Sequence, residues 1–234
     1  MGWRDLSPSE GVGEADWIRR GLHQALLLHD LGTVIPQGFD AYARILHPAP
    51  GAFGAEVRWS EVAAWNEKTV HAEMQFHAIG GPWNGMPQGM GPRVGQPSAG
   101  RLSDRQARIL VDLLEKHTAT RDSCWLCLWD GQGSLHPSGT EPPVLPKNRV
   151  KLPDRDYVLF NGSVAGARGW AEGPNLWWPN DRAWCVVSEV HVPCTYVGGT
   201  GALIERILAH SELEALPAKL SDGITIDSDR INSP

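Results

Sequence analysis

Apolar side chains recur at the three- and four-residue spacing of one helix face in three parts of the chain. This spacing predicts helices over residues 14–28, 103–117 and 202–210. Thr200 precedes the last of these and is expected to cap it, within a Gly-Gly-Thr-Gly turn that could alternatively bind an anion. Ser60 can cap a further short helix that ends at Trp65.

Other parts of the chain alternate apolar and polar positions or form short dense apolar runs, as strands do. These patterns predict strands over residues 41–46, 74–79, 123–129, 157–160 and 183–190. Pro174 and Pro179 within residues 174–182 predict a rigid turn that leads into the last strand.

The predicted helices and strands follow one another irregularly, without the repeating rhythm of a parallel α/β fold. We therefore expect an α+β protein with a mostly antiparallel mixed sheet, flanking helices and long Gly/Pro-rich loops. Residues 1–13 are expected to be a flexible N-terminal arm and residues 14–234 a single globular domain. Residues 80–100 hold seven glycines and four prolines, and a loop of this length is usually mobile or functional.

Composition and charge exclude several partner classes. The formal net charge is −6 and basic residues do not cluster, which argues against nucleic acid and against an anionic membrane surface. We expect no membrane span and no signal peptide, because no apolar run is long enough for either. Four dispersed cysteines favour a reducing compartment, so the cytoplasm is the expected location.

Tryptophan is unusually abundant, with 11 residues in 234. The candidate ligand- or partner-binding residues are Trp125, Trp129, Trp177, Trp178, Asp181, Arg182 and Trp184. Trp125 and Trp129 share one face of a predicted strand, and the others lie on or just after the Pro-bounded turn. Indoles on a rigid turn beside a charged pair could bind an apolar or aromatic ligand or anchor a protein partner. The alternative is that these indoles fill the core.

The sequence His71-Ala-Glu73, taken with Cys124-x-x-Cys127, resembles the signature of zinc-dependent cytidine deaminases. The resemblance implies that His71, Cys124 and Cys127 bind zinc and that Glu73 is the general acid/base. However, a strand over residues 123–129 would place the two cysteines on opposite faces. We therefore expect neither a metal nor another cofactor, and retain the deaminase as the alternative function.

The stretches CWLCLWDG, PNLWWPNDRAWCVVSEV and TYVGGTGALIERIL resemble an uncharacterised family of actinobacterial-type proteins. The resemblance covers residues 103–231 and implies a shared fold without an established activity. No nucleophilic triad or carboxylate pair can be identified in the sequence. The leading hypothesis is a non-enzymatic binding module for a protein partner or an apolar ligand, of which an immunity- or resistance-type protein is one version.

Overall fold

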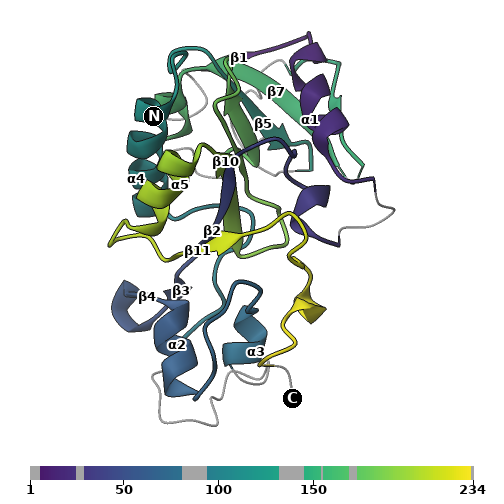
Figure 1. The fold of residues 1–234 in the computed structure, drawn as a ribbon. Coiled ribbons are helices and arrows are strands. Elements are labelled where there is room, and N and C mark those ends of the chain that lie inside the picture. Colours follow the sequence, from purple (N-terminus) through teal and green to yellow (C-terminus); the bar gives the residue numbers. More distant parts are fainter. Residues whose placement is uncertain are drawn as a thin grey trace.

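A single antiparallel sheet organises the molecule (Figure 1). The computed structural model describes residues 6–24, 29–80, 94–131, 145–153, 155–168 and 173–232. In the described residues the sheet has nine strands in the order β1-β7-β5-β8-β9-β10-β2-β11, and β6 also pairs with β7. The strands are β1 (Ser7–Pro8), β2 (Ala41–Leu46), β5 (Cys124–Trp129), β6 (Val150–Lys151), β7 (Asp156–Gly162), β8 (Leu176–Pro179), β9 (Trp184–Val187), β10 (Cys194–Gly199) and β11 (Ala215–Ala218).

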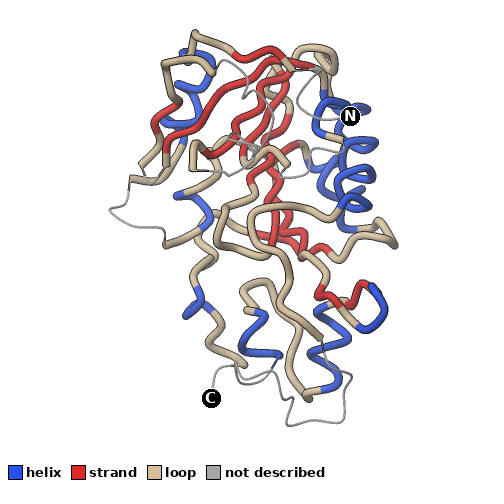
Figure 2. The backbone as a smooth tube through the Cα atoms, turned by 180° about the vertical axis from the view of Figure 1, so that it is seen from behind, coloured by secondary structure: helices blue, strands red, loops and turns tan. Residues whose placement is uncertain are grey.

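Helices flank this sheet, and a smaller group of elements lies at one end of it (Figures 1 and 2). The helices are α1 (Asp16–Gly21), α2 (Trp59–Trp65), α3 (Phe76–Gly80), α4 (Asp104–Leu114) and α5 (Gly201–Leu208). The two-stranded hairpin of β3 (Ala49–Pro50) and β4 (Glu56–Val57) lies beside α2 at the lower end of Figure 1. The predicted single-domain α+β fold with a mostly antiparallel sheet is confirmed.

Alternating side chains of the strands build two hydrophobic cores, one on each face of the sheet. Ala43 and Ile45 of β2 pack with α4 and α5, whereas Tyr42 and Leu46 belong to the other core. The second core also contains Trp59 and Phe76 of α2 and α3. Because successive side chains of a strand point to opposite faces, each central strand contributes to both cores.

The beginnings of α4 and α5 are where the sequence predicts them. Ser103 and Gln106 form a reciprocal capping box, in which each backbone N–H donates to the other side chain at 3.3 Å. Gln106 Nε2 also donates to the Leu46 carbonyl at 2.8 Å, which ties α4 to β2. Thr200 caps α5 by accepting from the Leu203 N–H.

Three predicted elements differ from the structure. The helix that Ser60 is expected to cap begins at Trp59 with Arg58 as its N-cap, so Ser60 lies inside α2. Residues 74–79, predicted as a strand, contain the helical turn α3 instead, because a short apolar run fits either period. The helix predicted over residues 14–28 ends at Gly21, and Leu22 is already extended. There the His23 N–H donates to the Gly32 carbonyl at 2.7 Å, which replaces a helical hydrogen bond. Residues 25–28 lie outside the described part.

Two segments predicted to be irregular belong to the sheet. The Pro-bounded turn over residues 174–182 contains β8, which pairs with β5 and β9. In the predicted flexible arm, Ser7–Pro8 form β1 on β7, at the sheet edge where proline is tolerated, and Leu6 is buried. Within the described residues, no helix combines the length and apolarity that a membrane crossing requires.

Candidate functional site

Two of the predicted binding tryptophans lie in the core beneath α4 and α5. Trp177 and Trp184 are 2% and 0% exposed, and their rings meet edge to face with centroids 5.2 Å apart. Trp184 Nε1 donates to the Leu114 carbonyl at 3.2 Å. Both indoles therefore pack inside the protein, and the ring N–H of Trp184 has its hydrogen-bond acceptor there.

The other predicted aromatic residues lie on the opposite face of the sheet. Trp178 is 1% exposed, and its ring packs edge to face on that of Trp17 with centroids 6.0 Å apart. The Arg182 guanidinium lies 5.4 Å from the Trp17 ring centroid. Trp125 and Trp129 are partly buried beside the same core, and Arg155 lies 5.1 Å from the ring centroid of Trp129.

Asp181 has a local structural role, since it accepts from the Thr118 hydroxyl at 2.9 Å and the Ala119 N–H at 2.8 Å. The structure thus divides the predicted Trp site between the two faces of the sheet. The reason is that Trp177 and Trp178 are neighbours in a strand rather than in a turn.

The four residues of the predicted deaminase signature do not come together. Cys124 lies in the core beneath α4 and α5, and Cys127 lies in the opposite core, as the predicted strand requires. Burial raises the pKa of the Cys124 thiol to about 12 and raises that of Cys127 as well, which disfavours the thiolates that bind zinc. In the part of the chain that the structure describes, no three His, Cys, Asp or Glu side chains are placed to hold a metal ion.

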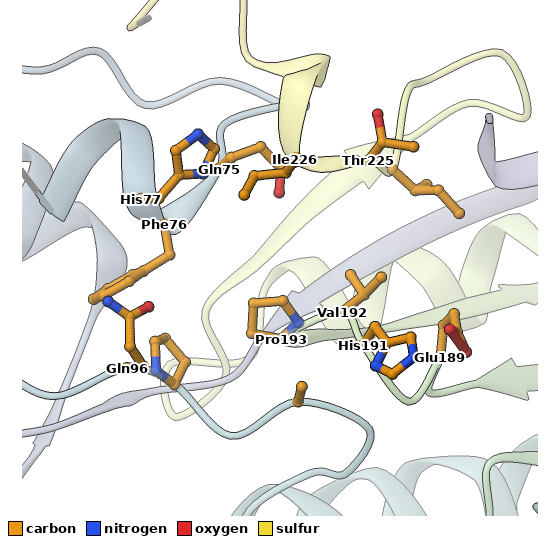
Figure 3. Close-up of a pocket in the computed structure, with 13 residues that line it drawn as sticks. Gln75, Phe76, His77, Gln96, Glu189, His191, Val192, Pro193, Thr225 and Ile226 are labelled. Atoms are coloured by element: carbon orange, nitrogen blue, oxygen red, sulfur yellow. The ribbon is translucent and has the colours of Figure 1, made fainter. Parts of the chain in front are cut away.

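An apolar pocket of about 450 Å³ lies where four chain segments meet (Figure 3). The segments are α3 with the residue before it, residues 94–99, the connection from β9 to β10, and residues 224–226 near the C-terminus. The lining residues are Gln75, Phe76, His77, Gln96, Pro97, Ala99, Glu189, His191, Val192, Pro193, Ile224, Thr225 and Ile226. Figure 3 shows Thr225 and Ile226 across the pocket from Val192 and Pro193.

Packing and hydrogen bonds fix the walls of this pocket. The Phe76 ring packs edge to face on Trp59 with ring centroids 5.2 Å apart, which anchors the wall that α3 forms. The Gly100 N–H donates to the Val192 carbonyl at 3.2 Å, which joins residues 94–100 to the β9–β10 connection. On that connection, Glu189 accepts two hydrogen bonds from Arg155, at 2.6 and 3.1 Å. These contacts hold the walls of the pocket in place.

A buried chain of hydrogen bonds also connects residues 94–99 to β10 and to the β9–β10 connection. His47 is 1% exposed, and its Nδ1 donates to the Ser98 carbonyl at 2.6 Å. Its Nε2 must then accept from the Thr195 hydroxyl at 2.9 Å, and Thr195 accepts from Ser188 at 2.6 Å. Burial lowers the pKa of His47 to about 4, with the hydrogen bond to Ser98 opposing the shift and the charge of Arg44 adding to it. His47 is thus a neutral structural residue near pH 7.

The polar groups of the pocket differ in whether they are already bonded. Glu189 is committed to Arg155. His77, Gln96 and His191 form no side-chain hydrogen bond or ion pair with the described residues, so all three can meet a ligand. Two imidazoles and an amide can donate to carbonyl or carboxylate oxygens, and the one carboxylate on the wall is neutralised.

No sequence motif marks this pocket, because its residues come from four separated segments. The one available signal is the Gly/Pro-rich stretch over residues 80–100, which is expected to be mobile or functional. Gln96, Pro97 and Ala99 of that stretch line the pocket, whereas residues 81–93 lie outside the described part.

Comparison with known proteins adds no assignment. No protein-family model, curated protein or solved structure matches this chain. The likeness of residues 103–231 to actinobacterial-type proteins therefore stays a prediction, and functional inference depends on the geometry of the chain itself.

Proposed function

We propose that this chain is a small-molecule-binding protein whose ligand occupies the apolar pocket beside α3. The observation that carries the proposal is a concave pocket with an apolar lining and a few polar groups that form no hydrogen bond with the described residues, the usual form of a ligand site. This keeps the binding-module function inferred from sequence but moves the site from the Trp residues to the four segments around Phe76.

The chemistry of the wall suggests the class of ligand. Phe76, Val192 and Ile224 favour an apolar or aromatic body. His77, Gln96 and His191 favour one hydrogen-bond-accepting group, such as a carbonyl or a carboxylate. A cationic ligand is disfavoured, since the Glu189 carboxylate that could attract it is paired with Arg155. A protein partner has less support, because the indoles proposed to anchor it are mostly buried.

We also propose a cytoplasmic location. Cys124, Cys127, Cys185 and Cys194 are all free and buried, which suits a reducing compartment.

A fluorescent dye with an apolar body and one anionic group, 1-anilinonaphthalene-8-sulfonate, tests the site. Ala99 lines the pocket and is itself exposed, so Ala99→Trp fills the pocket without removing a core contact. We expect Ala99→Trp to weaken dye binding by at least about 10-fold, equivalent to about 1.4 kcal/mol. Fluorescence titration at 25 °C measures the affinity.

Ala64→Trp is the matched control, since Ala64 is exposed on α2 outside the pocket lining and the change adds the same indole. The control is expected to bind the dye like the unmodified protein. Equal affinity in all three proteins, or no binding to the unmodified protein, would show that the pocket is not a ligand site.

A further inference from the structure

A second, polar pocket of about 460 Å³ lies against the C-terminal segment and shares only Thr225 with the lining of the apolar pocket. Its lining is rich in groups that carry protons or charge. The lining residues are His29, His71, Glu73, Ser221, Gly223, Thr225, Asp227, Ser228, Arg230 and Ile231. Apart from Thr225, the proposed ligand site makes no use of these residues.

A buried carboxylate, that of Asp229, is hydrogen-bonded to His71, one of the two histidines that line this pocket. Asp229 is 1% exposed and accepts from the backbone N–H groups of Gln75, Ile231 and Asn232, at 3.1, 3.1 and 2.8 Å. It also accepts from Asn232 Nδ2 at 3.0 Å and from His71 Nε2 at 2.9 Å. Burial acts to raise the pKa of Asp229, but these hydrogen bonds lower it to about 2. The carboxylate is therefore ionised throughout the neutral range.

Asp229 fixes which nitrogen of His71 carries the proton. An ionised carboxylate only accepts, so Nε2 must donate and Nδ1 of the neutral ring keeps its lone pair. Nδ1 forms no hydrogen bond with any described residue, and the side chain, which lines the pocket, is 15% exposed. A histidine held by a buried aspartate with its second nitrogen available is the arrangement of a general base.

The pocket also has a cation and a fixed wall. Arg230 is exposed, lines the pocket and forms no ion pair with the described residues. Glu73 Oε1 accepts from the Gly223 N–H at 2.7 Å, which holds the C-terminal segment against the turn before α3. A substrate carbonyl could thus meet a positive charge within a pocket of defined shape.

We propose that His71, oriented by Asp229, is the general base of a hydrolytic site that acts on a small polar ester, with Arg230 stabilising the carbonyl oxygen. Nδ1 removes a proton from water as the water oxygen bonds to the ester carbon. The ester C–O bond then breaks, and the departing alkoxide takes the proton from Nδ1. The products are an acid and an alcohol, and His71 is regenerated. This inference does not depend on the apolar pocket.

Hydrolysis of 4-nitrophenyl acetate, followed by release of 4-nitrophenolate, tests the proposal. We expect the protein to exceed free imidazole at equal concentration and His71→Gln to lower the rate by at least about 100-fold, the usual contribution of a general base. The glutamine amide can still donate to Asp229, so the fold is expected to persist. His117→Gln is the matched control, since His117 lies at the end of the turn after α4, outside both pockets, and its rate is expected to stay unchanged.

Arg230→Gln provides a second readout, because an exposed side chain can be replaced without unfolding the protein. We expect this variant to lose about 10-fold in kcat with little change in KM, since the charge acts on the transition state. The proposal is overturned if folded His71→Gln is as active as the unmodified protein. It is also overturned if Arg230→Gln keeps full activity, or if the unmodified protein is no faster than imidazole.

Discussion

Individual buried polar residues set how the stability of this protein depends on its conditions. His47 and Asp229 are both about 1% exposed, yet their environments favour opposite states. His47 is held neutral because one ring nitrogen donates to a carbonyl and the other accepts from a hydroxyl. Asp229 is held ionised because five donors surround its oxygens. Loss of stability on acidification is therefore expected in two separate ranges of pH.

His47 determines the first range. Its pKa is about 4 in the folded protein against 6.5 as the ordinary value, so the unfolded chain binds a proton more readily. The contribution of His47 to the free energy of unfolding is fully present above pH 6.5. It falls as the pH drops towards 4, by about 3 kcal/mol in total. Urea unfolding at pH 7, 5.5 and 4.5 measures this loss. His47→Gln is expected to lower stability at pH 7 but to flatten this dependence, whereas His117→Gln should retain it. An unchanged slope in His47→Gln would contradict the assignment.

At the scale of elements, the predictable parts are those in which local chemistry and burial agree. Ser103 and Gln106 mark the beginning of α4 in the sequence, and the dense apolar run that contains Cys124 and Cys127 correctly identifies β5. The strand β8 is missed because its prolines indicate a turn, whereas its place between β5 and β9 is decided by pairing with distant residues. The helical turn α3 is missed for a similar reason, since Asp229 in the far C-terminal segment accepts from the N–H of Gln75.

The candidate sites could be predicted less well than the elements. Thr225 lines both pockets, but no local pattern relates it to Phe76 or to His71. Tryptophan abundance fits either a binding surface or a filled core, and the sheet register places Trp177 and Trp184 in the core. The His71–Asp229 pair joins positions 158 residues apart, so only the folded chain shows it.

The capping box of α4 leads to a prediction at this scale. Ser103→Ala removes the acceptor for the Gln106 N–H and is expected to lower the free energy of unfolding by about 1 kcal/mol. Chemical denaturation measures the change. Ser211→Ala is the matched control, since Ser211 is exposed and its side chain forms no hydrogen bond with the described residues. Equal stability of the two variants would show that the cap is not needed to start α4.

At the scale of the whole molecule, the C-terminal segment connects parts that are distant in sequence (Figure 1). Residues 219–232 follow β11 and pass the short helical turn Leu31–Thr33 before they reach α3. The N–H groups of Leu31 and Gly32 donate to carbonyls of this segment at 2.9 Å, and Lys68 Nζ donates to the Asn232 carbonyl at 3.0 Å. Because the segment contributes one wall to each pocket, its attachment is expected to affect both.

Asn232 is the residue through which this attachment can be tested. It is 4% exposed, accepts from the Thr69 N–H at 2.8 Å and donates to the Thr69 carbonyl at 2.9 Å and to Asp229 at 3.0 Å. Asn232→Ala removes both hydrogen bonds to Thr69 and one of the donors to Asp229, and is expected to lower stability by about 2 kcal/mol.

If the segment opens on its own, amide hydrogen exchange over residues 222–231 should accelerate by about 30-fold while β5 and β7 stay protected. Dye affinity should then fall as well, because the segment forms the Ile224–Ile226 wall of the apolar pocket. Asn148→Ala removes only an exposed hydrogen bond to the Glu10 carbonyl and should change neither measurement. Uniformly faster exchange in Asn232→Ala would instead mean that the segment unfolds only together with the sheet, and that the two pockets cannot be opened separately from the fold.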